Sequence, residues 1–288
     1  MRNHSTFTAE AVDHYLQTGE HDPNNWNWPG QNFVEAEINA HRTMREALIS
    51  AVLERAPRQA QAPTPHISNL AALTRAKVTP MVNGLFPLIE RPAIMKALES
   101  SVVFLTPDNI EATLCASPWL HTTWSLANMY LLERGAEPLS PQAPAIVGLS
   151  QETTCYLSLD YLDSLEQYPF ADYLVHEAAH VFHNCKRSTV GLAETRSREF
   201  LLNIDYAKRE TFAYACEAYS RILMLADSPK GRREALLEHS QQSLPAEAGV
   251  DQQEYLDILA QAVGARNGWK RILKACAAPA HQAQARHA

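Results

Sequence analysis

Cysteine pairs, a secretory signal and long apolar runs are all lacking in this sequence. Its 288 residues include 5 cysteines, and no two of them form a Cys-x-x-Cys pair. The odd number and the spacing argue against a disulfide framework and against a cysteine-based zinc knuckle. The N-terminal region has no apolar signal core, and no apolar run approaches the roughly 20 residues of a membrane span. We therefore expect a soluble, cytoplasmic protein with no membrane partner.

Positive charge is also in the minority. Lys and Arg number 25 against 32 Asp and Glu, which gives a formal net charge of -7. Surfaces that bind nucleic acid are normally basic, so this balance argues against a nucleic-acid partner. The hydrophobic fraction of 46% and the charged fraction of 20% are those of an ordinary globular protein. The length suffices for one large domain or two modest ones.

Glycine is scarce, with 10 residues, which favours a mainly helical chain with few tight turns. Proline is expected to break the early helical pieces at Pro80, Pro87 and Pro92. A segment rich in Pro, Ala and Gln, 57–65, reads as a linker. Helices are predicted over 32–56, 66–78, 88–100 and 119–135, and near 169–184, 206–226, 230–242 and 251–276.

Three short runs are typical of β-strands instead. One covers 101–105, and the runs 145–150 and 153–159 are separated by a short polar turn, which predicts a hairpin. The expected fold class is therefore mainly α with a small β-sheet, an α+β fold. Because the character of the chain changes near residue 101, we expect a helical N-terminal region of unknown role over 1–100 and a second domain over 101–288.

The richest motif lies at 175–185, which reads VHEAAHVFHNC. His176, Glu177 and His180 form the pattern H-E-x-x-H. On a helix each residue turns by about 100°, so two imidazoles four residues apart can bind the same metal ion. The glutamate between them can take a proton from a metal-bound water without being a ligand itself. The alternative is an ordinary helix whose histidines are solvated or hydrogen-bonded in the core.

The helical period of this segment leaves room for a metal site. His176 and His180 lie on the flank of an apolar stripe, so the helix can bury one face and present both imidazoles to a cleft. His183 shares the face of His176 but lies about 10 Å further along the axis. We therefore do not expect His183 among the ligands, and an ordinary structural histidine is favoured over a residue that lines the cleft. The apolar stripe consists of Phe170, Leu174, Ala178, Val181 and Cys185.

A third ligand is needed, since a catalytic zinc commonly has three protein ligands and one open position. The later segment 208–226 supplies two carboxylates on one predicted helix face. The alternative is a solvated face that carries an ion pair between Glu217 and Arg221. The polar face consists of Glu210, Tyr214, Glu217 and Arg221, and the opposite face of Phe212, Cys216, Tyr219 and Leu223.

An H-E-x-x-H helix followed by a glutamate-bearing helix resembles the zincin metallopeptidases, and among them the gluzincins. The resemblance covers about 145–226. It implies that region 101–288 forms a zincin-like domain that binds Zn²⁺. It also implies that His176 and His180 are ligands and that Glu177 is the general base.

The resemblance further implies that the third ligand is a glutamate on the later helix. Glu210, which lies 30 residues after His180, is the first choice, and Glu217 is the alternative. The run E-T-F-A at Glu210 is similar to the Glu-x-x-Ala ligand helix of some bacterial members. The Asn-Glu-x-x-Ser-Asp stretch of thermolysin-like members has no clear counterpart, and the longer H-E-x-x-H-x-x-G-x-x-H pattern is missing. The subgroup is therefore not assigned.

The expected reaction is hydrolysis of a peptide bond in a protein or peptide substrate. Tyr214 is the first choice as hydrogen-bond donor to the oxyanion, with Arg221 and His183 as alternatives. The hairpin over 145–159 would supply an edge strand along which an extended peptide could lie.

Two other functions remain open at the level of sequence. One is a helical binding or scaffold protein with a structural or incidental metal. It predicts a glutamate face that is exposed to solvent and distant from His176 and His180. The other is a zinc hydrolase that acts on something other than peptides, since the same chemistry serves other electrophiles.

Overall fold

The computed structural model of the chain divides into two compact units. Unit 1 comprises Met1–His66, Phe104–Val147 and Ser158–Asp160, and unit 2 comprises Ile67–Val103, Gly148–Leu157 and Tyr161–Ala288. The predicted linker falls outside the described residues. The roles predicted for the two sequence regions stay predictions. The structure describes residues 4–22, 25, 27–56, 69–161, 167–195, 198–242, 244–247 and 249–279.

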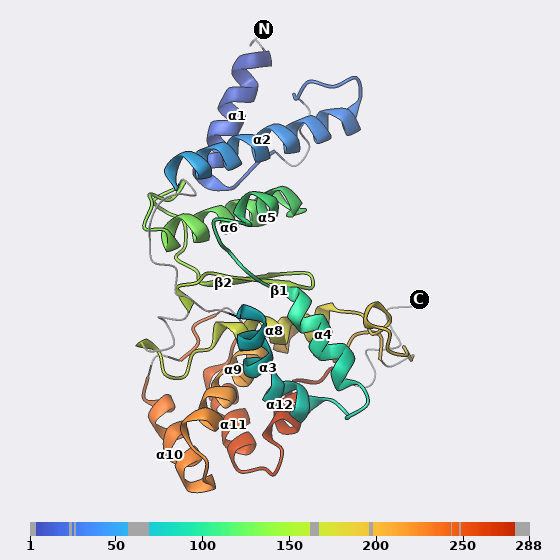
Figure 1. Cartoon of the computed structure of the whole chain (residues 1–288), viewed down its shortest axis with the longest axis vertical. Coiled ribbons are helices and arrows are strands. Elements are labelled where there is room, and N and C mark those ends of the chain that lie inside the picture. The colour runs from blue at the N-terminus through green and yellow to red at the C-terminus, as the bar shows by residue number, and fades with distance from the viewer. Residues whose placement is uncertain are drawn as a thin grey trace. The chain divides into compact units, whose positions relative to one another are not determined.

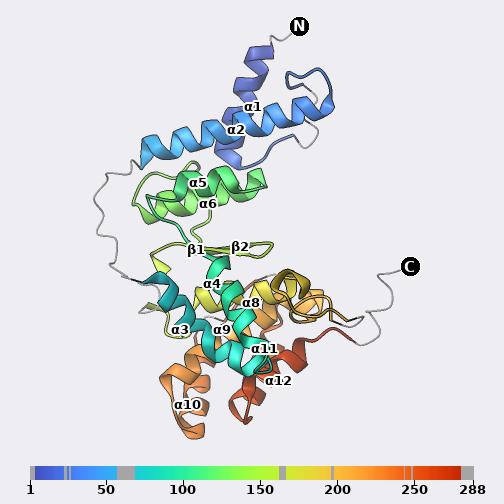
Figure 2. The ribbon, with the colours of Figure 1, turned by 45° about the vertical axis from the view of Figure 1, so that its right-hand side comes forward.

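The described part of unit 1 is helical. The longest helix, α2, contacts α1, α5 and α6, and Figure 2 shows α5 and α6 side by side. Asn32 caps the start of α2, because its side chain accepts a hydrogen bond from the Glu35 amide. The helices are α1 (His4–Thr18), α2 (Phe33–Arg55), α5 (Ile110–Ala116) and α6 (Leu120–Glu133) (Figure 1).

The core of unit 1 follows one face of α2, where buried side chains recur every four residues as a helix requires. Hydrogen bonds fix α1 to α6 beside this core. The Tyr15 hydroxyl donates to the Leu120 carbonyl at 2.7 Å, and the Trp124 indole donates to the Leu16 carbonyl at 2.9 Å. The buried side chains of α2 belong to Ala36, Ala40, Met44, Leu48 and Val52.

A small mixed sheet has the strand order β1-β3-β2, with strands β1 (Val102–Phe104), β2 (Gly148–Gln151) and β3 (Thr154–Leu157). β2 and β3 form an antiparallel hairpin in which Gly148 stands opposite Leu157. Glu152 adopts a positive φ of 53° at the tight turn between them. β2 is therefore the edge strand on one side of the sheet.

Helix α8 (Tyr173–Asn184) packs between the sheet and other helices of unit 2. This helix contacts both strands of the hairpin and also α9 (Arg209–Leu225), and Figure 1 shows it close to the sheet. The other helices in the described part of unit 2 are α3 (Leu70–Leu85), α4 (Arg91–Ser101), α10 (Pro229–Ser240), α11 (Gln252–Val263) and α12 (Gly268–Cys276), and its short 3₁₀ turns are η1 (Ser188–Val190) and η2 (Tyr206–Lys208).

The predicted mainly helical fold with a small sheet is confirmed. The predicted strand β1, the β2–β3 hairpin and helices α2, α6, α8, α9 and α10 all form, with ends within a few residues of those expected. Helices α1 and α5 were not predicted. None of the described helices combines the length and the apolar character that crossing a membrane requires.

Two of the three predicted proline breaks are wrong. α3 continues through Pro80, whose missing N–H leaves the Ala76 carbonyl without its helical partner. Both residues are exposed, so water can satisfy that carbonyl. Pro92 stands in the first turn of α4, where proline is well tolerated. Pro87 lies between α3 and α4, as predicted.

The predicted helix over 251–276 forms two helices. α11 ends at Val263 and α12 begins at Gly268. Asn267 caps α12, because its side chain accepts a hydrogen bond from the Lys270 amide. Gly264, the capping Asn267 and Gly268 therefore end one helix and begin the next, although the apolar period continues across them.

Candidate metal centre

Helix α8 carries the H-E-x-x-H residues in the interior of unit 2. It begins after Asp172, whose carboxylate accepts an amide hydrogen bond from the first turn and pairs with Lys77 at 2.7 Å. The predicted apolar stripe is buried, but His176, Glu177 and His180 are also only 7% exposed. The helix is thus enclosed on both its apolar and its polar face.

Side chains of α8 and α9 form a small triangle of ligand atoms. The Nε2 atoms of His176 and His180 lie 3.2 Å apart. Oε2 of Glu210 lies 3.7 Å from the first and 3.6 Å from the second. Tetrahedral ligands at about 2.0–2.1 Å from zinc lie about 3.3 Å from one another, so this donor set fits one ion. No other such group of His, Cys, Asp and Glu occurs among the described residues.

Glu217 lies on the other side of His176. Its Oε2 is 3.1 Å from Nδ1 of His176, and its Oε1 accepts a hydrogen bond from the Asp172 amide at 2.7 Å. Because Nδ1 is engaged in this way, Nε2 of His176 is left to face His180 and Glu210. The structure therefore brings Glu210 to the ligand edge of the imidazole, and Glu217 to the edge that orients it.

His180 has a histidine as its orienting partner. Nδ1 of His180 is 3.3 Å from Nε2 of His183, and the two rings meet edge to face. His183 is itself buried, and its Nδ1 has no hydrogen-bond partner among the described residues. His183 thus lies beside the candidate ligands.

Glu177 faces the hairpin. Its carboxylate is hydrogen-bonded to the Ser150 side chain of β2. A Cβ atom on Gly148 would lie 3.1 Å from Cγ and 3.2 Å from Oε1 of Glu177, so the glycine permits this close approach. Burial raises the pKa of Glu177 above its usual value. A raised pKa makes this carboxylate a stronger base than an exposed glutamate.

Two carboxylates dominate the surroundings of His176. Burial lowers the pKa of His176, but the neighbouring carboxylates of Glu210 and Glu217 outweigh burial and raise it to about 10. Burial and the charge of His176 lower the pKa of His180 to about 4. The nearby His176 lowers the pKa of Glu210. The site therefore contains buried carboxylates that require a positive charge among them.

Tyr214 and Arg221 complete the predicted polar face of α9. The Tyr214 ring packs at 4.4 Å from the His176 ring, and burial, followed by the charge of Glu217, raises its pKa and keeps its hydroxyl protonated. The buried Arg221 instead donates a hydrogen bond to the Pro169 carbonyl at 2.7 Å.

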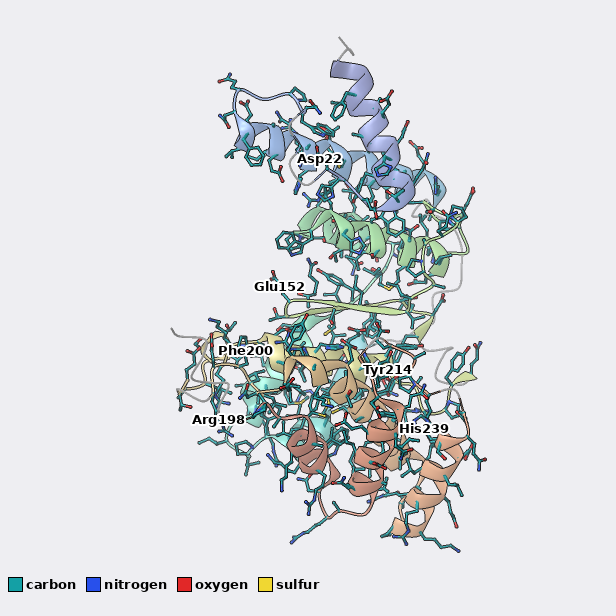
Figure 3. All side chains as sticks on the ribbon, turned by 180° about the vertical axis from the view of Figure 1, so that it is seen from behind. Asp22, Glu152, Arg198, Phe200, Tyr214 and His239 are labelled. Atoms are coloured by element: carbon teal, nitrogen blue, oxygen red, sulfur yellow. The ribbon has the colours of Figure 1, made fainter. Side chains whose placement is uncertain are left out.

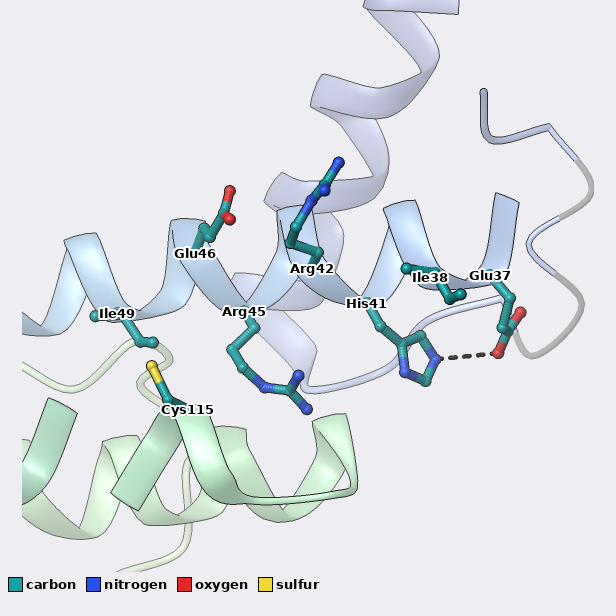
Figure 4. A pocket seen from close by; sticks show the side chains of 8 residues that line it. All are labelled: Glu37, Ile38, His41, Arg42, Arg45, Glu46, Ile49 and Cys115. Atoms are coloured by element: carbon teal, nitrogen blue, oxygen red, sulfur yellow. Dashed lines mark ion pairs between the residues drawn. The ribbon is translucent and has the colours of Figure 1, made fainter. Parts of the chain in front are cut away.

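Unit 1 contains a cavity of about 450 Å³ (Figure 4). Its lining mixes opposite charges, with His41 held 3.1 Å from Glu37, and Arg45 donating to a backbone carbonyl. The exposed Cys115 also lines it. Its side chains do not form a convergent ligand set within the part of the chain that is described, so the chemistry concentrates in unit 2.

Three residues around the metal centre were not predicted: Asp172, Ser150 and Gly148. Asp172 could have been found as an aspartate immediately before a helix. No sequence signal identifies Ser150 or Gly148, because the contact of β2 with Glu177 depends on tertiary packing. Comparisons of the chain with family models, curated proteins and solved structures gave no match.

Proposed function

We propose that the chain is a zinc-dependent metallopeptidase with a zincin-like core. The observation that carries this proposal is the convergence of ligand atoms from His176, His180 and Glu210 within 4.8 Å of one another. Two histidines and one glutamate form the ligand set of catalytic zinc sites that keep a fourth position open. The buried Glu177 beside them supplies the group that such a centre needs for proton transfer.

Each residue then has a distinct task in hydrolysis. A zinc ion held by this set would polarise the scissile carbonyl and a water molecule. Glu177 accepts a proton from the attacking water and passes it to the leaving amine, so that an amide and water become an acid and an amine. Its raised pKa suits both transfers. Tyr214 is the proposed hydrogen-bond donor to the developing oxyanion.

The edge strand β2 supports a peptide as the substrate. It is the last strand in the order β1-β3-β2, and Ser150 holds it beside Glu177. An extended peptide that adds to this edge would form backbone hydrogen bonds and would place one of its carbonyls near the base. This arrangement favours a peptidase over a zinc hydrolase that acts on other substrates.

A scaffold protein with a structural metal is the competing function. It predicts an exposed glutamate face that is distant from the histidines. Glu210 instead lies within 3.7 Å of both imidazoles, and Glu217 is buried 3.1 Å from His176. A structural site is usually closed by four ligands, whereas the donor set here has three. These contacts favour catalysis.

The decisive experiment compares Glu177→Gln with His176→Ala. We expect purified wild type and Glu177→Gln to contain one zinc ion per chain by plasma mass spectrometry, and His176→Ala to lose it. Cleavage of a quenched fluorescent peptide library should fall about 10²- to 10⁴-fold in Glu177→Gln, since the variant lacks the base. Normal cleavage by Glu177→Gln would refute the assigned base. Well-folded wild type that binds no offered zinc would refute the metal centre.

A further inference from the structure

A cavity of about 270 Å³ lies next to the metal centre in unit 2. Tyr173 of α8 and Tyr214 and Glu217 of α9 line it, and these helices also carry the candidate ligands. The ring of Tyr214 contacts the ring of His176. The Tyr214 side chain therefore lies between the cavity and the candidate metal centre. Figure 3 labels Tyr214 on α9 and His239 on α10, which also lines the cavity.

We propose that this cavity binds a tyrosine side chain of the substrate, next to the peptide bond that is cleaved. The proposal rests on the proposed function, because it assigns a substrate class to the same centre. A volume of about 270 Å³ falls just below the roughly 300–1,000 Å³ of sites that hold whole small molecules. The cavity is therefore of a size for one side chain.

The lining favours an aromatic occupant. Phe170, Tyr173, Tyr214 and Tyr255 present rings to the cavity, and Tyr168, which is 58% exposed, also lines it. Aromatic rings pack favourably edge to face or offset against one another, and such pairs contribute beyond their buried area. An aliphatic side chain would gain the burial but not these ring contacts.

His239 distinguishes tyrosine from phenylalanine. It is only 6% exposed, and its Nε2 lies 2.6 Å from the Tyr255 hydroxyl. Its Nδ1 has no hydrogen-bond partner among the described residues. Burial lowers the pKa of His239 to about 4, so the imidazole is neutral at pH 7. His239 lines the cavity, and a phenol that reaches its Nδ1 can donate to it or accept from it, whichever tautomer is present.

A basic occupant gains little from the carboxylate at the wall, because that carboxylate already has partners. Both oxygens of Glu217 are already engaged, one by the Asp172 amide and the other by His176. A lysine or arginine placed in the cavity would therefore have to share the Glu217 carboxylate with these two partners. No acidic occupant is favoured either, because the described lining includes no lysine or arginine.

The first test measures binding to chelator-treated protein, so it does not depend on activity. Ligand-observed NMR would measure the affinities of three probes. The probes are the C-terminal amides of N-acetyl-tyrosine, N-acetyl-phenylalanine and N-acetyl-lysine. We expect the tyrosine probe to bind about three- to tenfold more tightly than the phenylalanine probe, the value of one neutral hydrogen bond. The lysine probe should be the weakest. Equal affinities, or preference for lysine, in wild type would overturn the proposal even if no variant folds.

Two variants locate the binding. Ala171→Leu fills the cavity and should weaken the tyrosine probe at least tenfold, whereas the same change at Ala93, a half-buried residue that lines a different cavity, should not. His239→Gln preserves a group at the position of Nε2 for Tyr255 but removes Nδ1. It should abolish the preference for tyrosine over phenylalanine. Unchanged binding in a folded Ala171→Leu would place the probe elsewhere.

Peptide cleavage separates this inference from the proposed function. If wild type cleaves peptides without preference for an adjacent tyrosine, the cavity assignment fails and the peptidase stands. If the tyrosine probe binds selectively but zinc-loaded protein cleaves no peptide, the peptidase fails and the binding cavity stands. We expect selective binding together with cleavage beside tyrosine, and a shift of the cleavage preference in His239→Gln towards phenylalanine.

Discussion

The two nitrogens of His176 have different environments, and this difference decides how the candidate centre works. Nδ1 faces Glu217, while Nε2 faces His180 and Glu210. Histidines that bind metals usually donate their second N–H to a carboxylate or a carbonyl, which fixes the tautomer and the ring orientation. Glu217 provides that carboxylate, and the Asp172 amide in turn holds Glu217 in place.

This arrangement predicts that Glu217→Gln weakens metal binding while the fold is kept. A glutamine has one oxygen where the carboxylate has two, so it cannot accept from both the Asp172 amide and Nδ1 of His176. We expect zinc affinity to fall about 10- to 100-fold, as is usual when an orienting partner is lost. Competition with a chromogenic chelator would measure it.

Glu234→Gln is the matched control, since Glu234 is mostly exposed and pairs only loosely with Lys230 at 3.6 Å. It should bind zinc as wild type does. Complete loss of zinc in Glu217→Gln, equal to the loss in His176→Ala, would mean that Glu217 is itself a ligand. Unchanged affinity would mean that the ring needs no such partner.

The sequence predicts the histidine ligands more directly than the glutamates. His176 and His180 follow from a fixed spacing on one helix, which geometry alone brings together. Glu210 and Glu217 share a face of a second helix, and Glu210 was the first choice only through the resemblance, because the helical period alone does not say which of them approaches Nε2. That choice depends on how α9 packs against α8, a tertiary contact between segments about 30 residues apart. No local sequence pattern predicts this packing of α9 against α8.

At the scale of elements, the position of α8 depends on its N-terminus. Asp172 is fully buried there, caps the helix, pairs with Lys77 at 2.7 Å and accepts a hydrogen bond from the Tyr161 hydroxyl at 2.6 Å. Removing one partner of a buried ion pair leaves an uncompensated charge. α8 also presents the candidate ligands, so its docking and the site are coupled.

We expect Asp172→Ala to lower the free energy of unfolding by about 3–5 kcal/mol, because it leaves the charge of Lys77 buried without a partner. Urea denaturation followed by circular dichroism would measure the loss. Asn69→Ala removes an exposed cap, that of α3, and should cost only about 1 kcal/mol. Similar losses in the two variants would show that Asp172 acts only as a cap.

The contact of α10 with α11 predicts a dependence of stability on pH. His239 and Tyr255 join these helices through a buried hydrogen bond. Burial lowers the pKa of folded His239 to about 4, against about 6.5 in an unfolded chain. Between these values only the unfolded state takes up the proton, so the free energy of unfolding falls as the pH falls, by up to about 1.4 kcal/mol per unit.

Denaturation curves at pH 7 and pH 5 for wild type and His239→Gln would test this dependence. The glutamine does not titrate, so the advantage of wild type over the variant should shrink on acidification. The comparison isolates His239 from the other buried histidines, which both proteins share. An advantage that stays constant from pH 7 to pH 5 would mean that His239 titrates normally in the fold.

Helices were predicted best where an apolar period was uninterrupted, and their ends were predicted worst. The break expected at Pro80 did not occur, because the carbonyl that lost its partner lies on the exposed side of α3. The long helix expected over 251–276 is divided by the cap at Asn267. The first error depends on solvent exposure and the second on helix capping, and the spacing of apolar residues predicts neither.

At the scale of the whole molecule, the candidate ligands lie within one of two compact units. His176, His180 and Glu210 are all in unit 2, while the core around α2 belongs to unit 1. A ligand stabilises only the cooperative unit that must be folded to bind it. Zinc therefore offers a way to ask whether the two units unfold separately.

We expect calorimetry of chelator-treated protein to resolve two transitions, and zinc to raise the temperature of one of them only. Free zinc at 100 times its Kd adds about 2.7 kcal/mol to the unit that binds it. Trp269 is the single tryptophan of unit 2 in the sequence, so Trp269→Phe would identify that transition by fluorescence. His176→Ala should remove the shift. A single transition that moves as a whole would show that both units unfold together, and no shift in wild type would contradict the metal centre itself.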